Sequence, residues 1–310
     1  STFDVLNPAN DNVIAAVANC GSRETEQAIT AAHGALALWS ATPAKERARL
    51  MRAWFEIITA NAETLATLLT IEQGKPFKEA KAEITYGASY IEWFGEEAKR
   101  IYGDVIPAPG ADKRIFTIKQ PVGVVGCITP WNFPNAMLAR KIAPAIASGC
   151  TTVCKPANET PLSALALAHY ANVVGIPDGV INILCGKTAE IGETLTGSNK
   201  VRKLTFTGST AVGKKLTADC AATMKRTSME LGGNAPFIIF GDADIPAAVN
   251  GLMASKFRNS GQTCVCANRI LVQANIYDDF AKALQIATEK LVVGDGMDPQ
   301  TTIGPLIHSK

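Results

Sequence analysis

The sequence predicts an α/β protein built on a parallel sheet that helices cover on both faces. From about residue 122, short apolar segments alternate with stretches of helical periodicity. Each intervening stretch is long enough to serve as a crossover between parallel strands. The 310 residues, 47% of them hydrophobic and 19% charged, suffice for two domains with separate cores.

The first hundred residues predict helices. From 22 to about 69, apolar residues recur at helical spacing, with Leu50, Trp54, Ile57 and Ile58 on one face. A second helical stretch runs from about 79 to 100. Between 102 and 120, two alternating segments flank a Pro-Gly turn, which predicts a protruding hairpin.

The chain from residue 122 onward is predicted to form the parallel sheet and its connecting helices. Strands are expected at 122–129, 150–155, 180–184, 203–206 and 235–240, and helices at 135–147, 161–174, 188–197, 210–222 and 244–258. Because such sheets bind ligands beyond the carboxyl ends of their strands, we expect the chemistry in the strand-to-helix turns.

Composition narrows the class of protein. The 30 basic and 28 acidic residues leave a net charge of +2 without long like-charged runs, so a nucleic-acid partner is not predicted. No apolar run approaches the roughly 20 residues that cross a bilayer. Eight scattered cysteines suit a reducing compartment. We therefore expect a soluble cytoplasmic protein, or a mitochondrial matrix protein if a targeting peptide has been removed.

Two turns carry candidate binding groups. "ITPWNFP" (128–134) is either a Pro-rich turn anchored by Trp131 and Phe133, or a site where the Asn132 amide donates to a developing oxyanion. Lys155 ends the next predicted strand. It is either solvated or, beside a cofactor cleft, a partner for ribose hydroxyls or a phosphate.

Two further turns are weaker signals alone. In "FTGSTAVG", Gly208 and Ser209 open a helix whose N–H groups suit a pyrophosphate, although this is not a GxGxxG fingerprint. In "MELGG", Glu230 is either a surface residue or, in a cleft facing thiols, a general base.

The stretch "FRNSGQTCVCANR" (257–269) places Cys264 and Cys266 one residue apart. A metal site is not predicted, because only these two thiols cluster and the three histidines lie far away without ligand spacing. Buried packing, a disulfide and a nucleophile with a companion stay open.

Taken together, these motifs resemble the aldehyde dehydrogenase superfamily, in the family's order. The segments "EWFGEEAKRIYGD", "KQPVGV", "FTGST", "MELGG" and "ASKFRNSGQTCVCANR" look like its succinate-semialdehyde dehydrogenase group. The resemblance covers essentially the whole chain. The family normally continues well past the "GPLI" motif at 304–307, so we expect a C-terminally incomplete sequence.

The resemblance implies an aldehyde dehydrogenase-like fold. Residues 1–101 and 121–232 would form a Rossmann-type NAD(P)-binding domain, 102–120 an oligomerisation hairpin, and 233–310 the start of a second α/β catalytic domain. A homodimer or homotetramer is implied for the full-length protein.

The resemblance also assigns roles. Cys264 would be the nucleophile, Asn132 and the Cys264 backbone N–H would stabilise the oxyanion, and Glu230 would activate the water that hydrolyses the thioester. The implied cofactor residues are Trp131, Lys155, Asn158, Thr207, Gly208, Ser209 and Leu231.

Cofactor and substrate choice rest on three positions. NAD-preferring members often carry an acidic residue at position 158 that would repel a 2′-phosphate, so Asn158 predicts use of NADP as well as NAD. Arg140 and Arg258 are the implied clamp for the distal carboxylate of the aldehyde, beside Phe133.

Three alternatives accompany this interpretation. A one-carbon-longer glutarate semialdehyde could use the same clamp, because a methylene changes binding by only about 1 to 3 kcal/mol. An inactive or structural protein could retain the fold. Cys266 is either packing or the partner of Cys264 in a reversible regulatory disulfide.

Overall fold

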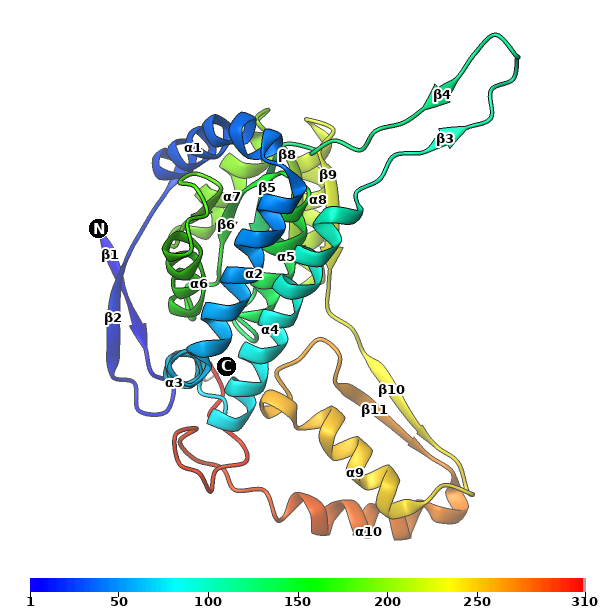
Figure 1. The fold of residues 1–310 in the computed structure, drawn as a ribbon. Helices are drawn as coiled ribbons and strands as arrows, with labels where there is room; N and C mark the ends of the chain where they lie inside the picture. Colours follow the sequence, from blue (N-terminus) through cyan, green and yellow to red (C-terminus); the bar gives the residue numbers. More distant parts are fainter. Residues whose placement is uncertain (309–310) are drawn as a thin grey trace.

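A five-stranded parallel sheet forms the centre of the larger unit in the computed structural model, which describes residues 1–308 (Figure 1). Its strand order is β7-β6-β5-β8-β9. The strands are β5 (Val124–Ile128), β6 (Thr151–Lys155), β7 (Ile181–Ile183), β8 (Val201–Thr207) and β9 (Arg226–Glu230). Four of them confirm the predicted strands that begin at 122, 150, 180 and 203.

The fifth strand corrects the prediction. The sheet is completed by β9, whereas the predicted strand at 235–240 is β10 (Ala235–Ile239) and pairs elsewhere. The sequence of β9, "RTSME", contains two charged and two hydroxyl residues because β9 lies at the sheet edge and is only partly buried. A search for apolar runs therefore does not identify β9 as a strand.

Helices cover both faces of the sheet, as predicted. The connecting helices are α5 (Ala136–Ala147), α6 (Leu162–Val173), α7 (Thr188–Gly197) and α8 (Thr210–Ala221). Along β5, Val125 and Cys127 pack into the core beneath α5 and α6, whereas Val124 and Ile128 pack into the core beneath α7 and α8. The strand is thus buried on both sides.

The N-terminal helices form an outer layer. They are α1 (Ser22–Ala41), α2 (Ala44–Ala60), α3 (Ala62–Gln73) and α4 (Phe77–Glu97), followed by the short η1 (Ala98–Arg100). Trp54 of α2 is fully buried, and its indole N–H donates to the Leu167 carbonyl of α6. An antiparallel pair, β1 (Thr2–Leu6) with β2 (Val13–Ala18), precedes them and was not predicted.

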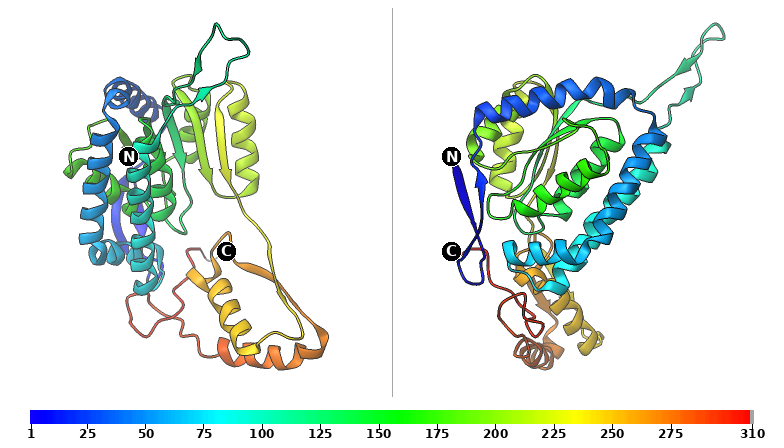
Figure 2. Two further views of the ribbon diagram at one scale, coloured as in Figure 1. Left: turned by 45° about the vertical axis from the view of Figure 1, so that its right-hand side comes forward. Right: turned by 60° about the vertical axis from the view of Figure 1, so that its left-hand side comes forward.

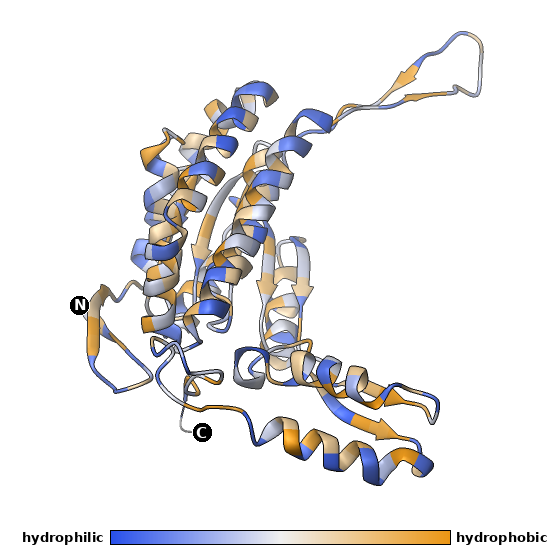
Figure 3. Cartoon of the chain, turned by 60° about the horizontal axis from the view of Figure 1, so that its bottom comes forward, coloured by the Kyte–Doolittle hydropathy of each residue, from blue (hydrophilic) through white to orange (hydrophobic). Residues whose placement is uncertain are grey.

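The predicted hairpin projects from the body of the molecule (Figure 1). Its strands, β3 (Val105–Ile106) and β4 (Ile115–Phe116), pair antiparallel. Val105, Phe116 and Ile118 expose 84%, 73% and 73% of their surface, and Figure 3 shows the hydrophobic colouring of this arm. The arm therefore carries apolar side chains that nothing in the described chain covers.

A second, smaller unit hangs below the sheet (Figure 2). In it β10 pairs parallel with β11 (Ala267–Val272), and α9 (Ile245–Lys256) and α10 (Tyr277–Thr288) pack on this pair. The short turns η2 (Arg258–Gly261) and η3 (Ala274–Ile276) complete it. Ile238, Phe240 and Leu271 are more than half exposed there.

Within residues 1–308, none of the helices combines the length and the apolar character that a bilayer crossing requires.

Candidate active site

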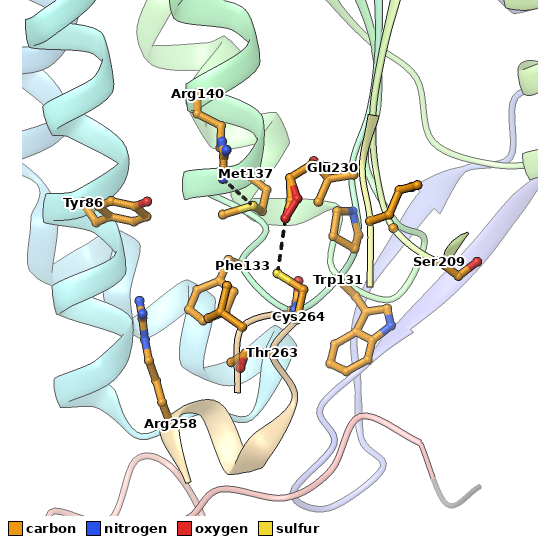
Figure 4. A pocket seen from close by; sticks show the side chains of 16 residues that line it. Tyr86, Trp131, Phe133, Met137, Arg140, Ser209, Glu230, Arg258, Thr263 and Cys264 are labelled. Atoms are coloured by element: carbon orange, nitrogen blue, oxygen red, sulfur yellow. Dashed lines mark hydrogen bonds between the residues drawn. The ribbon is translucent and has the colours of Figure 1, made fainter. Parts of the chain in front are cut away.

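A pocket of about 270 Å³, here called the thiol pocket, lies between the two units (Figure 4). The turns after β5, β8 and β9 line one side, and the loop after α9 lines the other. It brings together eleven of the predicted site residues: Trp131, Asn132, Phe133, Arg140, Thr207, Gly208, Ser209, Glu230, Leu231, Arg258 and Cys264.

Cys264 and Glu230 face each other at the centre of the pocket (Figure 4). The thiol donates to Oε1 of Glu230 across 3.7 Å. Burial raises the pKa of the Cys264 thiol above its ordinary value, and the neighbouring Glu230 carboxylate raises it further. The resting group is therefore a thiol, and the carboxylate is placed to accept its proton.

The loop that carries Cys264 has an unusual backbone. The helix α9 ends at Lys256, and Asn259, Ser260 and Gly261 then adopt φ values of 51°, 58° and 76°. Three successive left-handed residues turn the chain sharply back into the pocket. The prediction that Arg258 belongs to the helix is wrong for the same reason, since Arg258 lies beyond the helix end in η2.

The side-chain amide of Asn132 is held by the cysteine loop. Its Nδ2 donates to the Gln262 carbonyl over 2.8 Å, and its buried Oδ1 has no partner among residues 1–308. An amide nitrogen carries two N–H groups, so one remains for a ligand in the pocket. This fits the predicted oxyanion donor.

The two arginines approach the pocket from different elements. Arg140 lies on α5, where its Nη1 contacts Met137 Sδ at 3.6 Å, and Arg258 lies 4.9 Å above the Phe133 ring. Within residues 1–308, neither guanidinium pairs with a carboxylate. Both are therefore available to an anionic ligand.

Residues that the sequence did not single out complete the pocket. Tyr86 of α4 lies on the same side of Cys264 as the two arginines, and Trp131 and Ser209 lie on the other (Figure 4). The additional lining residues are Tyr86, Pro130, Met137, Thr263 and Val265. In the sequence, Tyr86 is one of many residues in a long amphipathic helix, so no local pattern marks it as a pocket residue.

A second cavity of about 570 Å³, the adjoining cleft, continues from the thiol pocket. Both are lined by Pro130, Trp131, Thr207 and Gly208. Its other walls come from the ends of β5, β6 and β8 and from α7 and α8, and include Lys155, Asn158, Glu159, Val212 and Lys215. The cleft thus lies at the carboxyl ends of the parallel strands, where the sequence analysis expects a cofactor.

Lys155 and Asn158 form one hydrogen-bonded unit in the cleft wall. The Lys155 ammonium donates to Asn158 Oδ1 and to the Pro156 carbonyl, each over 3.0 Å. Burial lowers the pKa of Lys155 below its ordinary value. Asn158 also accepts the Gly186 N–H at Oδ1 and donates from Nδ2 to the Gly186 carbonyl, which leaves one Nδ2 N–H for a ligand.

Glu159, which no sequence motif singles out, adds a negative charge to the cleft. Its carboxylate lines the same cleft and lies 3.5 Å from Nε2 of His308. A carboxylate next to Asn158 opposes a 2′-phosphate and favours ribose hydroxyls.

The donor set of the cleft fits a dinucleotide. The side chain of Ser209 caps α8 by accepting from the Val212 N–H. Because Gly208 and Val212 at this end of the helix line the cleft, the positive end of the helix dipole faces it. The hydroxyl oxygens of Thr129 and Thr207 are buried in the cleft wall and have no hydrogen-bond partner in the part of the chain that the structure describes. Lys155 would hold ribose oxygens, and the α8 N-terminus would hold a phosphate.

Cys266 lies outside both cavities. It is buried, and its thiol contacts the carbonyls of Gly261 and Thr263 at 3.3 and 3.2 Å. Every cysteine in the chain is a free thiol in this structure. Within residues 1–308, no three His, Cys, Asp or Glu side chains gather as metal ligands would.

Fold and site together place a thiol against a carboxylate, beside a cleft at the carboxyl ends of a parallel sheet. The chain belongs to the aldehyde dehydrogenase family, whose sequence model matches residues 1–310. Among its relatives are a succinate-semialdehyde dehydrogenase (NADP+) of Escherichia coli K12, 57% identical over 308 residues, and a glutarate-semialdehyde dehydrogenase of Pseudomonas aeruginosa, 56% identical over 309.

Solved structures agree with this membership. The crystal structure of succinate-semialdehyde dehydrogenase from Burkholderia pseudomallei superimposes with a TM-score of 0.99 at 53% identity. An NADP-dependent enzyme of E. coli gives 0.98 at 56% identity. These matches cover 99 to 100% of this chain, which spans 64% of the length of each of these relatives and structures.

Proposed function

We propose that this chain carries the cofactor cleft and nucleophile of an NAD(P)-dependent aldehyde dehydrogenase that oxidises succinate semialdehyde to succinate. The observation that carries the proposal is the contact between Cys264 and Glu230 in a pocket that opens into a dinucleotide-sized cleft. A thiol beside a base, with an amide donor opposite, is the arrangement that covalent acyl chemistry needs.

The reaction begins with proton transfer from the Cys264 thiol to Glu230. The sulfur attacks the aldehyde carbon, a C–S bond forms, and the carbonyl oxygen of the resulting thiohemiacetal is held by Asn132 and the Cys264 backbone N–H. A bound nicotinamide supplies the hydride acceptor. Once the proton taken from the thiol has passed to solvent, the Glu230 carboxylate takes a proton from water and the water oxygen attacks the thioester carbon. The C–S bond then breaks to release the carboxylic acid, and the proton on Glu230 returns to the sulfur.

Arg140 and Arg258 support a substrate with a distal carboxylate. They approach the pocket from α5 and from the loop after α9. Cys264 lies between these arginines and the adjoining cleft. The relatives divide between succinate and glutarate semialdehyde at nearly equal identity. Glutarate semialdehyde is therefore the second candidate substrate.

We propose that the enzyme uses NADP as well as NAD. Asn158 leaves position 158 uncharged, and Lys155 places an ammonium beside it. Glu159 supplies the opposing charge that limits the affinity for a 2′-phosphate. A relative named for NADP shares 57% identity with the chain.

Assembly and location are part of the same proposal. The apolar arm of β3 and β4 supports a homodimer or homotetramer, because its side chains would otherwise stay in water. Residues 1–101 and 121–232 would act as the cofactor-binding domain and 233–310 as part of the catalytic domain. Relatives include bacterial proteins and mitochondrial ones of Arabidopsis thaliana and humans, in keeping with a cytoplasmic or matrix location.

An inactive protein of structural role is the competing class of function. The contact between Cys264 and Glu230, with Asn132 in the same pocket, argues against it.

The experiment that tests the proposal compares initial rates of NAD(P)H formation with succinate semialdehyde, glutarate semialdehyde and propanal. The full-length protein and the 310-residue chain are assayed side by side, each with NAD and with NADP. We expect the full-length protein to prefer the carboxylated aldehydes in kcat/KM. Equal rates for all three aldehydes would contradict the substrate class, and no turnover would support the structural alternative.

A further inference from the structure

Lys75 is a fully buried lysine behind the thiol pocket, and it lies in neither of the two cavities. It follows Gly74, which ends α3 with φ at 93°, and precedes the first turn of α4. At Gly74 a side chain would collide with the rings of Pro8 and Pro305. The tight turn therefore directs the lysine inward, where its ammonium must find partners within the protein.

The ammonium makes three contacts. It pairs with Glu83 Oε2 at 2.6 Å, donates to the main-chain carbonyl of Asn132 at 2.7 Å, and lies 4.0 Å from the centre of the Phe133 ring. One contact neutralises the charge. The other two hold the loop that presents the Asn132 amide to the pocket.

The same carbonyl joins this loop to the cysteine loop. Asn259, one of the left-handed residues before Cys264, donates its side-chain amide to the Asn132 carbonyl over 3.0 Å. In the other direction, Asn132 Nδ2 donates to the Gln262 carbonyl. Lys75 and the cysteine loop thus fix the Asn132 peptide from two sides.

Glu83 has partners of its own. Its Oε1 accepts the backbone N–H groups of Asn135 and Ala136 at 3.0 and 3.2 Å, at the start of α5. A neutral glutamine at this position could still accept there. The two functions of Lys75, neutralising Glu83 and holding Asn132, can therefore be separated by substitution.

We infer that Lys75 is a positioning residue for the oxyanion step, because it fixes the Asn132 main chain so that the free amide N–H meets the oxygen of the tetrahedral intermediate. The inference rests on the proposed function, which makes Cys264 the nucleophile. Misplacement of a reacting group by about 1 Å costs about 100-fold in rate, so loss of this hold should slow oxyanion formation by 10- to 100-fold.

The test uses acylation of Cys264 by p-nitrophenyl acetate in the full-length protein. The sulfur forms a bond to the ester carbonyl carbon, Glu230 takes the thiol proton, and the C–O bond to nitrophenolate breaks through an oxyanion. This step needs neither aldehyde nor cofactor. Alkylation by iodoacetamide is measured in parallel, because it consumes the same thiol without forming an oxyanion.

Two variants separate positioning from charge neutralisation. Lys75→Met removes the ammonium and leaves Glu83 unpaired, whereas Lys75→Met with Glu83→Gln also removes the unpaired charge. Lys81→Met is the matched control, since this α4 lysine pairs with Glu63 at the surface. We expect the nitrophenolate burst to slow at least 10-fold in both Lys75 variants, while alkylation stays within threefold and the control matches the parent.

Several results would overturn the inference: no slowing of the burst, equal slowing of acylation and alkylation, recovery in the double variant, failure of the double variant to fold, or no burst in the parent. A parent protein that shows the burst but oxidises no semialdehyde would overturn the proposed substrate alone. In that case the expected burst loss in the variants would still support the role of Lys75.

Discussion

The Sγ atom of Cys264 lies 3.7 Å from Oε1 of Glu230, and these two residues come from different units of the fold. Glu230 ends the edge strand of the five-stranded sheet, and Cys264 follows α9 in the smaller unit. Because the carboxylate and burial both raise the pKa of the thiol, Glu230 is placed to activate Cys264 only by taking its proton.

Replacing Glu230 with glutamine should separate its effect on the pKa of Cys264 from its action as a base. In Glu230→Gln, loss of the charge should lower the pKa of Cys264, so iodoacetamide alkylation should reach its plateau at lower pH than in the parent. Turnover should fall by about 100- to 10,000-fold, because the base for deacylation is lost. Alkylation profiles and steady-state rates measure the two effects. An alkylation profile that does not move, or moves to higher pH, would show that the carboxylate does not act on the thiol.

Arg258 should discriminate between aldehydes. In Arg258→Ala, kcat/KM for succinate semialdehyde should fall about 10- to 100-fold, mainly through KM, because a charge-assisted hydrogen bond to a carboxylate is lost. Propanal has no carboxylate, and it also reports any disturbance of the Phe133 ring over which Arg258 lies. Equal losses for both aldehydes would refute the carboxylate clamp.

Charges at positions 158 and 159 should set cofactor preference. Asn158→Glu should lower the ratio of kcat/KM for NADP to that for NAD by about tenfold, and Glu159→Gln should raise it, since a carboxylate repels the 2′-phosphate. Measuring both cofactors on each variant provides the internal control. Strict NAD use by the parent would show that an uncharged position 158 does not suffice for NADP.

Glu72 should make stability depend on pH. Its buried carboxylate accepts the N–H groups of Leu162 and Ser163 at the start of α6, and burial raises its pKa from 4.5 to about 7. The folded state therefore holds this proton more tightly than the unfolded state. The stabilisation is fully present below about pH 4.5 and is lost as pH rises through 7, on the order of 3 kcal/mol.

Denaturant unfolding at pH 5 and pH 8 tests this dependence. Relative to Glu72→Gln, the parent should lose stability as the pH rises, whereas the exposed α1 substitution Glu26→Gln should leave the parent's dependence unchanged. A parent that gains stability relative to Glu72→Gln over this interval would reverse the sign and disprove the raised pKa.

Cys266 provides a redox test. Its buried thiol faces backbone carbonyls rather than the pocket, so a disulfide with Cys264 would require the loop to rearrange and should be labile. If the disulfide protects the nucleophile, dithiothreitol should restore activity to the parent after peroxide treatment. It should not restore activity to peroxide-treated Cys266→Ala. The same reversibility in both proteins would eliminate the switch and leave packing as the role of Cys266.

Local sequence patterns predict the helices and most of the central sheet because β5 and β6 are buried on both faces, and the partly buried β7 and β8 still carry apolar residues. The pattern fails at β9, where a partly exposed edge strand needs no apolar run, and at β10, because periodicity does not say which sheet a strand joins. The residues at strand ends, such as Asn132 and Glu230, stand beside turn signals and are found easily.

Residues that act through long-range contacts leave no such signal. Lys75 and Asn132 are separated by 57 positions, and only the folded chain brings the ammonium to the carbonyl. The helix end at Lys256 is similar, since the left-handed run at 259–261 depends on bonds from Asn259 to Glu79 and to Asn132. Tertiary structure, rather than local propensity, determines both.

The most direct measurement of the central claim is peptide mass spectrometry of full-length Glu230→Gln after reaction with succinate semialdehyde and NADP at alkaline pH, where a larger fraction of the buried thiol ionises. The proposed mechanism predicts one equivalent of NADPH per subunit and a succinyl thioester on Cys264 that persists because hydrolysis is slow. NADPH formation without an adduct on Cys264, or an adduct on another residue, would contradict it.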